Sequence, residues 1–344
     1  MALPARLRRG ILASPFLLIA YLCFTLMDPK KMEAHWTPFL IAGKMEWDGG
    51  SVPILSTFYH SKLLDDTWRP FTVLFSPSAL GYDPVAWWLG FSFLNNLAPM
   101  YAIWMLERFS PTVFALLGQF IGAGTAVPLF YFLCLTFGPD EPTPDTANRR
   151  RTTTKTPSRS FILPLLLAFH TLESFGAYLA PDLQTRHWFT WTWQLLPLWT
   201  GLGDAVLSRL FPTPPATGSG FLGLGQDDAQ LGFLTLIAAG VWGYMLSCAP
   251  YSPSAILVPA RLVEDGFVAH ARLVLQLDNI CTFGASFLWM AYSYAGLYRA
   301  GRIRRRDCVW MVACLPVVAA SGGPAAALAF VWWWKEKKAY RVGK

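Results

Sequence analysis

The sequence is poor in charged residues. Only 14% of its 344 residues are Asp, Glu, Lys or Arg, whereas soluble globular proteins contain about 25%. Instead, 54% of the residues are hydrophobic, and long apolar runs recur along almost the whole length. This composition excludes a disordered, collagen-like or coiled-coil protein, and it favours a polytopic membrane protein over two soluble domains.

The sequence also lacks the patterns that bind metal ions and phosphates. None of its six cysteines belongs to a C-x-x-C pair, and H-E-x-x-H, G-x-S-x-G and phosphate-binding glycine loops are absent. Asp65 and Asp66 are followed by Trp68 and Arg69, where a diphosphate–magnesium motif would continue with a carboxylate. We therefore expect no metal ion and no disulfide framework.

The basic residues do not cover a soluble face. The chain has a formal charge of +7, and most Lys and Arg lie beside apolar runs, in clusters at residues 6–9, 149–159, 299–306 and 335–344. This distribution excludes nucleic acid as a partner and indicates segments next to a membrane. The positive-inside rule would put all four clusters in the cytosol, which eight simple spans do not allow, so the orientation stays open.

About eight segments, with seven to nine as the range, are long and apolar enough to cross a bilayer. The first follows three arginines and has no A-x-A cleavage site after it, so we interpret it as an uncleaved helix. The predicted fold is an all-α, polytopic bundle of transmembrane helices that forms a single domain, 1–344. The segments are 11–27, 84–107, 111–137, 161–180, 189–211, 231–248, 273–298 and 308–334.

Two of the predicted connections are informative. Residues 138–160 are rich in Pro, Thr and then Arg, which predicts a mobile basic loop. Residues 28–83 are too apolar and aromatic for a linker. Long segments of this kind often fold back as binding loops, so we expect 28–83 to form a capping or re-entrant loop over the bundle.

Acidic residues within the apolar segments are candidates for chemistry. Glu107, Glu173, Asp204 and Asp278 lie in or at the ends of predicted spans. A charge at bilayer depth costs several kcal/mol, so such groups face the bundle interior and are functional candidates by default. A carboxyl group shielded from water can stay protonated at neutral pH and act as a general acid. The alternative is a structural role, as helix-packing contacts or ion pairs at the membrane interface.

Aromatic residues are the other abundant feature. The 16 Trp, 12 Tyr and 25 Phe are concentrated in or beside the predicted spans. Most are expected to be lipid-facing or interfacial anchors. A subset that lined a cavity in the bundle could stabilise positive charge through cation–π attraction.

A particular order of motifs runs through the first third of the chain and continues later. It resembles the fungal membrane-bound terpene cyclases of ascochlorin and ascofuranone biosynthesis. The motifs are Phe58-Tyr59-His60, Asp65-Asp66-Thr67-Trp68-Arg69, Phe93-Leu94-Asn95-Asn96, Trp104-Met105-Leu106-Glu107, the Glu173 segment and Trp191-Thr192-Trp193-Gln194.

The resemblance implies a membrane-bound cyclase of fungal secondary metabolism that needs neither a metal nor an organic cofactor. Such an enzyme protonates the terminal epoxide of a farnesylated aromatic substrate, which is lipophilic, and the polyene then cyclises as a cation. The resemblance also implies a multi-pass protein of the endoplasmic reticulum, in contact with membrane lipids, with a pathway enzyme such as an epoxidase as a partner.

For a cyclase of this type, the catalytic acid is expected to be Asp278 or Glu173, with Glu107 as the third choice. Asn95-Asn96 departs from the family pattern, in which an acidic residue is expected nearby. Asp65 and Arg69 are expected to form a structural pair, and His170 shares a helix face with Glu173. The predicted substrate contacts are Trp68, Asp65, His170, Tyr101 and Trp104.

Two other classes of protein fit the same composition. A transporter would also place carboxyl groups in its spans, but no internal repeat is visible. A non-catalytic lipid-binding or scaffold protein would tolerate neutral replacement of each of these carboxyl groups.

Overall fold

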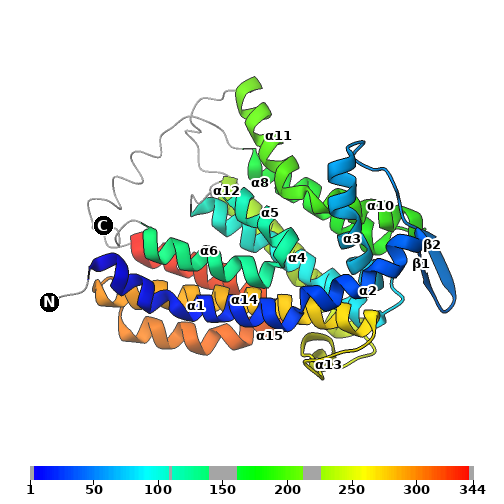
Figure 1. The fold of residues 1–344 in the computed structure, drawn as a ribbon. Helices are drawn as coiled ribbons and strands as arrows, with labels where there is room; N and C mark the ends of the chain where they lie inside the picture. The colour runs from blue at the N-terminus through cyan, green and yellow to red at the C-terminus, as the bar shows by residue number, and fades with distance from the viewer. Residues whose placement is uncertain (1–3, 108–110, 139–160, 212–225, 341–344) are drawn as a thin grey trace.

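The computed structural model describes residues 4–107, 111–138, 161–211 and 226–340 (Figure 1). Within these ranges the fold is all-α except for one two-stranded hairpin. The predicted basic loop lies outside the described residues from residue 139 onward. The long bundle helices are α1 (Ala5–Met27), α4 (Pro84–Leu106), α6 (Ala123–Phe137), α12 (Gln226–Cys248), α14 (Phe267–Arg299) and α15 (Arg305–Tyr340).

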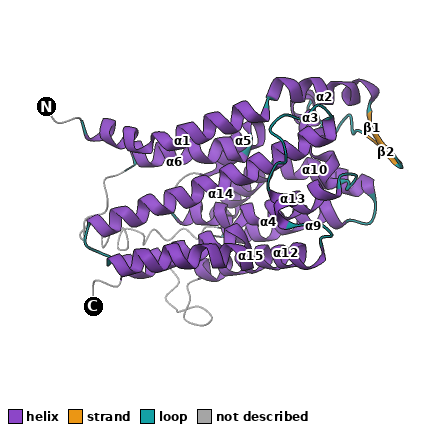
Figure 2. Ribbon diagram, turned by 90° about the horizontal axis from the view of Figure 1, so that it is seen from below, coloured by secondary structure: helices purple, strands orange, loops and turns teal. Residues whose placement is uncertain are grey.

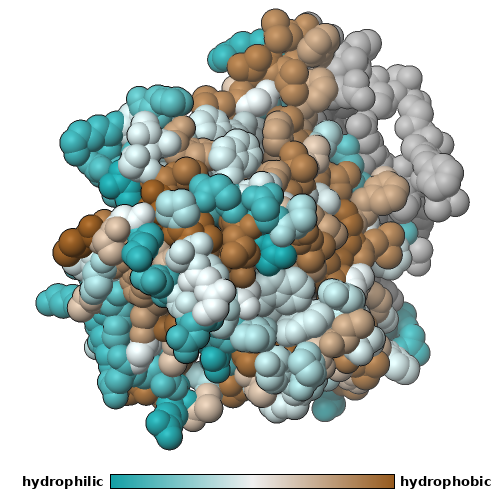
Figure 3. All heavy atoms as spheres, turned by 90° about the vertical axis from the view of Figure 1, so that its right-hand side faces the viewer, coloured by the Kyte–Doolittle hydropathy of each residue, from teal (hydrophilic) through white to brown (hydrophobic). Residues whose placement is uncertain are grey.

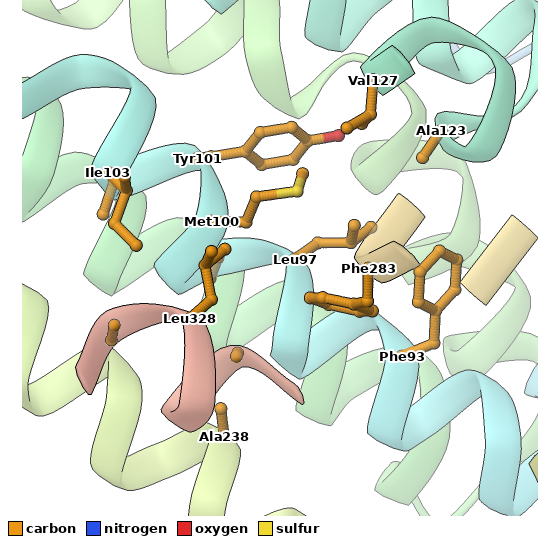
Figure 4. Packing of buried hydrophobic residues seen from close by; sticks show 14 of the residues in the cluster. Phe93, Leu97, Met100, Tyr101, Ile103, Ala123, Val127, Ala238, Phe283 and Leu328 are labelled. Atoms are coloured by element: carbon orange, nitrogen blue, oxygen red, sulfur yellow. The ribbon is translucent and has the colours of Figure 1, made fainter. Parts of the chain in front are cut away.

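Helix α4 is the centre of the bundle. It contacts α12, α15, α14 and α3, and almost every residue from Ala86 to Trp104 is buried. Side chains from α4, α6, α12, α14 and α15 meet at this centre, including Leu97 of α4, Phe283 of α14 and Leu328 of α15 (Figure 4). A helix that is apolar on all its faces is expected in such a buried position.

Within the described ranges, five helical stretches are long and apolar enough to cross a membrane. They cover Arg6–Ala42, Ile162–Leu179, Asp228–Cys248, Phe267–Arg299 and Arg305–Lys337. The all-α class is confirmed by the described residues, whereas the predicted number of about eight spans is not shown. The segment that forms α4 was predicted as a span, but it is not among these five. It is buried by the helices that pack around it.

Three predicted segments are divided into shorter helices. Segment 111–137 forms α5 (Pro111–Ile121) and α6, separated at Gly122, whose φ of 82° is incompatible with a continuous helix. Segment 161–180 forms α8 (Ile162–Leu165), the π-helix η1 (Leu166–His170) and α9 (Thr171–Leu179). Segment 189–211 is shared between α10 (Leu183–Gln194) and α11 (Leu196–Leu210).

Residues 28–83 form regular elements where a long loop was predicted. They comprise α2 (Pro29–Ala42), β1 (Lys44–Trp47), β2 (Gly50–Pro53) and α3 (Lys62–Ala79). These elements lie at the end of the molecule opposite the two termini (Figures 1 and 2). The surface at that end mixes hydrophilic and hydrophobic side chains (Figure 3). The capping role of this segment stays a prediction.

The remaining elements complete the bundle. The short helix α13 (Pro253–Leu257) precedes α14. Helix α15 is kinked at Gly323, directly before Pro324, and a kink at such a position frees backbone N–H groups. The side chain of Asn96 on α4 accepts a hydrogen bond from the N–H of Ala325 at 3.0 Å. Asn96 therefore ties the kink of α15 to the central helix.

Candidate functional site

A cavity of about 320 Å³ lies between α1, α2, α3, α4, α5, α10 and α14. This volume is within the range of small-molecule sites, about 300–1,000 Å³. Its lining is mostly apolar and aromatic, and includes Trp36, Phe71, Phe75, Phe93, Leu97, Trp193 and Val274. Three polar side chains, Tyr101, Gln119 and Asp278, interrupt this lining.

Asp278 is held at the start of helix α6. Its side chain projects from α14, and its Oδ1 atom accepts a hydrogen bond from the N–H of Gly124 at 2.6 Å. The first N–H groups of a helix have no partner within that helix, so a carboxylate there satisfies a free donor and faces the positive end of the helix dipole. The Asp278 residue is 7% exposed and contributes to the cavity wall.

Tyr101 and Gln119 are the other polar members of the lining. Tyr101 extends from α4 toward the start of α6 (Figure 4), and Gln119 lies on α5. They are 7% and 8% exposed, respectively. Among the residues that the structure describes, neither the Tyr101 hydroxyl nor the Gln119 amide has a hydrogen-bond partner. Two buried polar groups of the cavity are thus available to a bound molecule.

Gly122 keeps the carboxyl group accessible at the break between α5 and α6. A Cβ atom at this position would lie 2.7 Å from Asp278 Oδ1 and 2.7 Å from Met27 Cε. Both distances are far below van der Waals contact, so a larger residue would displace the carboxyl group or the wall of the cavity.

Glu173 and His170 lie outside this cavity lining, on α9 and at the end of η1. The His170 Nε2 atom is 2.8 Å from the carbonyl oxygen of Leu94 on α4, and no contact joins the imidazole to Glu173. His170 therefore connects η1 to α4, and the predicted orienting role is not supported. Glu173 is buried, and its Oε2 atom has no hydrogen-bond partner.

Glu107 belongs to a polar contact between α4 and α15. Its Oε1 atom accepts a hydrogen bond from Trp332 Nε1 at 2.7 Å and also binds the ammonium group of Lys335. Lys335 in turn lies 3.1 Å from Glu336. These contacts give the partly exposed Glu107 a structural role, which is the alternative that the sequence left open.

Asp65 stabilises the loop that precedes α3. Its Oδ1 atom accepts hydrogen bonds from the N–H groups of Phe58 and Tyr59 at 2.9 and 2.8 Å. Burial opposes ionisation, but these hydrogen bonds outweigh it and lower the pKa of Asp65. The predicted pair with Arg69 is wrong, because Arg69 lies 3.7 Å from Asp66 and donates to the carbonyl of Ser56 instead.

The two tryptophans predicted as substrate contacts, Trp68 and Trp104, lie in different surroundings. Trp68 is buried behind the cavity wall, with its ring 4.4 Å from that of Phe120, which lines the cavity. Trp104 belongs to the core, where its Nε1 donates to the hydroxyl of Tyr131 at 2.9 Å. Of the eight predicted site residues, only Tyr101 and Asp278 come together at the cavity.

Three residues of the site were missed by the sequence reasoning. Gln119 stands as a polar residue within the apolar run of α5, and Gly122 and Gly124 flank the helix break. Gln119 was missed because only acidic residues within the apolar segments were considered as candidates. A single polar residue within an apolar segment is the pattern that would have indicated it.

Comparison with known proteins identifies two relatives in Penicillium. The chain is 26% identical over 323 residues to the FAD-dependent monooxygenase verC1 of Penicillium polonicum, which covers 87% of this chain and 39% of that protein. It is 30% identical over 293 residues to the FAD-dependent monooxygenase anuJ of Penicillium roqueforti, covering 79% of this chain and 34% of that protein. The chain thus spans between a third and two fifths of the length of these relatives. No family model matches the chain, and no solved structure is significantly similar to it.

These relatives overturn the resemblance to terpene cyclases. Both are named FAD-dependent monooxygenases, so the identification as a metal-independent cyclase that protonates a farnesyl epoxide is wrong. The motifs that carried it are combinations of aromatic, amide and acidic residues. Several of them have structural roles here, including Asp65, Asn96, Trp104 and Glu107.

The described residues do not fit FAD. Dinucleotide-binding folds hold the pyrophosphate at a glycine-rich turn between a parallel strand and a helix. In the described ranges the strands are those of the antiparallel β1–β2 hairpin, which is followed by an irregular segment before α3. Gly122 connects two helices and Gly124 lies in the first turn of α6, where the Asp278 carboxyl group already accepts the N–H that an anion would need. We therefore derive no flavin chemistry from this part of the chain.

Proposed function

We propose that this chain is a membrane-embedded component of an FAD-dependent oxygenation system, in which it binds the lipophilic substrate. The flavin is held by residues other than the described ones. The observation that carries the proposal is the aromatic cavity with the buried, unpartnered polar groups of Tyr101 and Gln119. The names of the two relatives support the class of reaction.

The proposal also places the chain in a membrane that it crosses several times. The five long apolar helices support this location. A tagged full-length protein is expected to stay with membranes during alkaline carbonate extraction, and release into the supernatant would contradict the proposal. The endoplasmic reticulum is the compartment to examine first, by co-fractionation with a resident marker.

Deletion of the gene, followed by comparison of the lipophilic metabolites, tests the type of reaction. We expect one product to disappear and a precursor that lacks one oxygen atom to accumulate. Wild-type protein should restore the product, whereas the variant Gln119→Leu should restore less of it at equal protein level. A precursor with the same elemental composition as the lost product would overturn the proposal, because the missing step would then be an isomerisation.

The position of the flavin has its own test. The purified chain in lipid nanodiscs, saturated with FAD and then gel-filtered, is expected to retain no stoichiometric flavin absorbance. Stoichiometric retention would contradict the conclusion that these residues do not fit the cofactor.

A further inference from the structure

The polar groups of the cavity can bind a hydrogen-bonding ligand. The Tyr101 hydroxyl and the Gln119 amide are not among the fully buried polar atoms that lack a partner, so they are open to the cavity. A polar group that loses this access without gaining a partner costs about 1–3 kcal/mol. Tyr101 and Gln119 both face the cavity with more than nine tenths of their surface buried. A molecule that donates to the Gln119 carbonyl or accepts from the Tyr101 hydroxyl would avoid this cost. A purely apolar molecule that filled the cavity would incur it.

The charge of the site favours a neutral polar group on that molecule. Asp278 is the acidic residue of the lining, and it already faces the N-terminal turn of α6 through the N–H of Gly124. The helix dipole partly balances a negative charge at this position. Among the described lining residues no Lys or Arg is present, so an anionic head group would find no cation. Tyr101 and Gln119 are neutral and can both donate and accept.

The cavity lining includes two side chains, on α1 and α5, that are also exposed at the surface. Phe24 of α1 and Phe120 of α5 both line the cavity, and they are 42% and 43% exposed, respectively. Helix α1 belongs to the candidate membrane span Arg6–Ala42. An opening between such residues faces lipid chains, and a lipid-soluble molecule could enter through it without crossing water.

We propose that the cavity binds a lipid-soluble alcohol or phenol that enters sideways from the bilayer. The hydroxyl group lies at Gln119, Tyr101 and Asp278, and the apolar part packs against Phe71, Phe75 and Trp36. This inference deepens the proposed function, because it names the substrate class of the same cavity.

Photolabelling with simple amphiphiles tests the site without knowledge of the natural substrate. The full chain is placed in dioleoylphosphatidylcholine nanodiscs with a diazirine-bearing dodecanol, and labelled residues are located by mass spectrometry. Dodecane and dodecylamine with the same diazirine serve as comparisons. We expect dodecanol to label α5 between Gly118 and Ile121, and to do so about fivefold more than dodecane, in line with one net hydrogen bond.

Matched variants assign the preference to the polar groups. Gln119→Leu should reduce dodecanol labelling about fivefold and leave dodecane labelling unchanged. Gln230→Leu, on α12 outside the cavity, should change neither. Tyr101→Phe keeps the ring and should produce a smaller loss. Each variant is compared only where its thermal unfolding in detergent matches that of the wild type.

The opening is tested by narrowing it. Phe120→Trp should slow the appearance of the label, whereas Val113→Trp on the exposed surface of the same helix should not, because Val113 does not line the cavity. Equal rates in the two variants would overturn the lateral path.

Other outcomes would overturn the chemical assignment. Equal labelling by dodecanol and dodecane would mean that any acyl chain, including that of a phospholipid, occupies the cavity. Preferential labelling by dodecylamine would make Asp278 a counter-ion for a cation. Because none of these measurements depends on oxygenation, the alcohol site can stand if the proposed reaction fails, and the reaction can stand if the site fails.

Discussion

Glu107 and Asp278 are both carboxyl groups within the helical bundle, Glu107 partly exposed and Asp278 buried, and their surroundings differ. Glu107 is bound by the indole N–H of Trp332 and the ammonium group of Lys335. Asp278 accepts one backbone N–H and otherwise borders a cavity that also contains unpartnered polar groups. Burial of an acid in a membrane segment therefore does not by itself identify a site. Unpartnered polar neighbours beside a cavity are the more informative sign.

The largest effect on stability is expected when the contact between Glu107 and Lys335 is removed. Lys335→Met removes the buried ammonium group that the partly exposed carboxylates of Glu107 and Glu336 share, and we expect a loss of up to about 3 kcal/mol, the lower end of the cost of breaking a buried ion pair. Thermal unfolding in detergent measures this loss. Lys337→Met, at an exposed position of the same helix, is the control. Equal effects of the two substitutions would mean that the Glu107 contact has no structural role.

The next effect concerns pH and the region around α10. His187 accepts hydrogen bonds from the N–H of Leu55 and from Trp191 Nε1, and burial lowers its pKa to about 4. As the pH falls below about 6.5, the unfolded chain binds a proton that the folded chain does not bind until about pH 4. The free energy of unfolding should therefore decrease across this window, by up to about 3 kcal/mol.

His187→Gln keeps an acceptor and removes this titration, so its unfolding temperature should vary less between pH 7 and pH 5 than that of the wild type. The lowered pKa of Asp65 adds a further loss of stability only below about pH 4. An unchanged pH dependence in His187→Gln would show that the destabilising proton binds elsewhere.

The sequence predicted the class of the fold better than its details. The long apolar runs predicted an all-α bundle, because runs of this length form helices that bury their apolar surface against one another or in lipid. They did not predict the break at Gly122, where a positive φ separates two short helices. They also made α4 a predicted span, although its hydropathy does not place it among the candidate membrane helices and other helices cover it.

The candidate site was predicted only in part for a related reason. Asp278 and Tyr101 were selected for their type, but they lie 177 positions apart and meet through the packing of α4 and α14. The spacing of His170 and Glu173 suggested a pair, yet tertiary packing directs His170 to the Leu94 carbonyl. Spacing along one helix does not determine which neighbouring helix supplies the partner.

A smaller effect is expected at the helix break. Gly122→Ala should destabilise the protein by about 2 kcal/mol, because φ is 82° and the new Cβ would collide with Asp278 Oδ1 and Met27 Cε. Gly240→Ala on α12 is the control, since its Cβ would meet no atom within 4 Å. That substitution should be neutral or slightly stabilising. A neutral Gly122→Ala variant would mean that the break can relax and that the carboxyl group is not confined by it.

The smallest effect on stability is expected at Asp278 itself. Asp278→Asn retains an oxygen that can accept the N–H of Gly124, so the free energy of unfolding should change by less than about 1 kcal/mol. Glu107→Gln should cost more, because it removes the carboxylate that lies against Lys335. Thermal unfolding of the two amide variants side by side compares the two carboxyl groups directly. Asp278→Ala, which loses the cap entirely, should fall between them. If Asp278→Asn destabilised the protein as much as Glu107→Gln, Asp278 would be a structural carboxyl like Glu107, and the cavity would depend on Gln119 and Tyr101 alone.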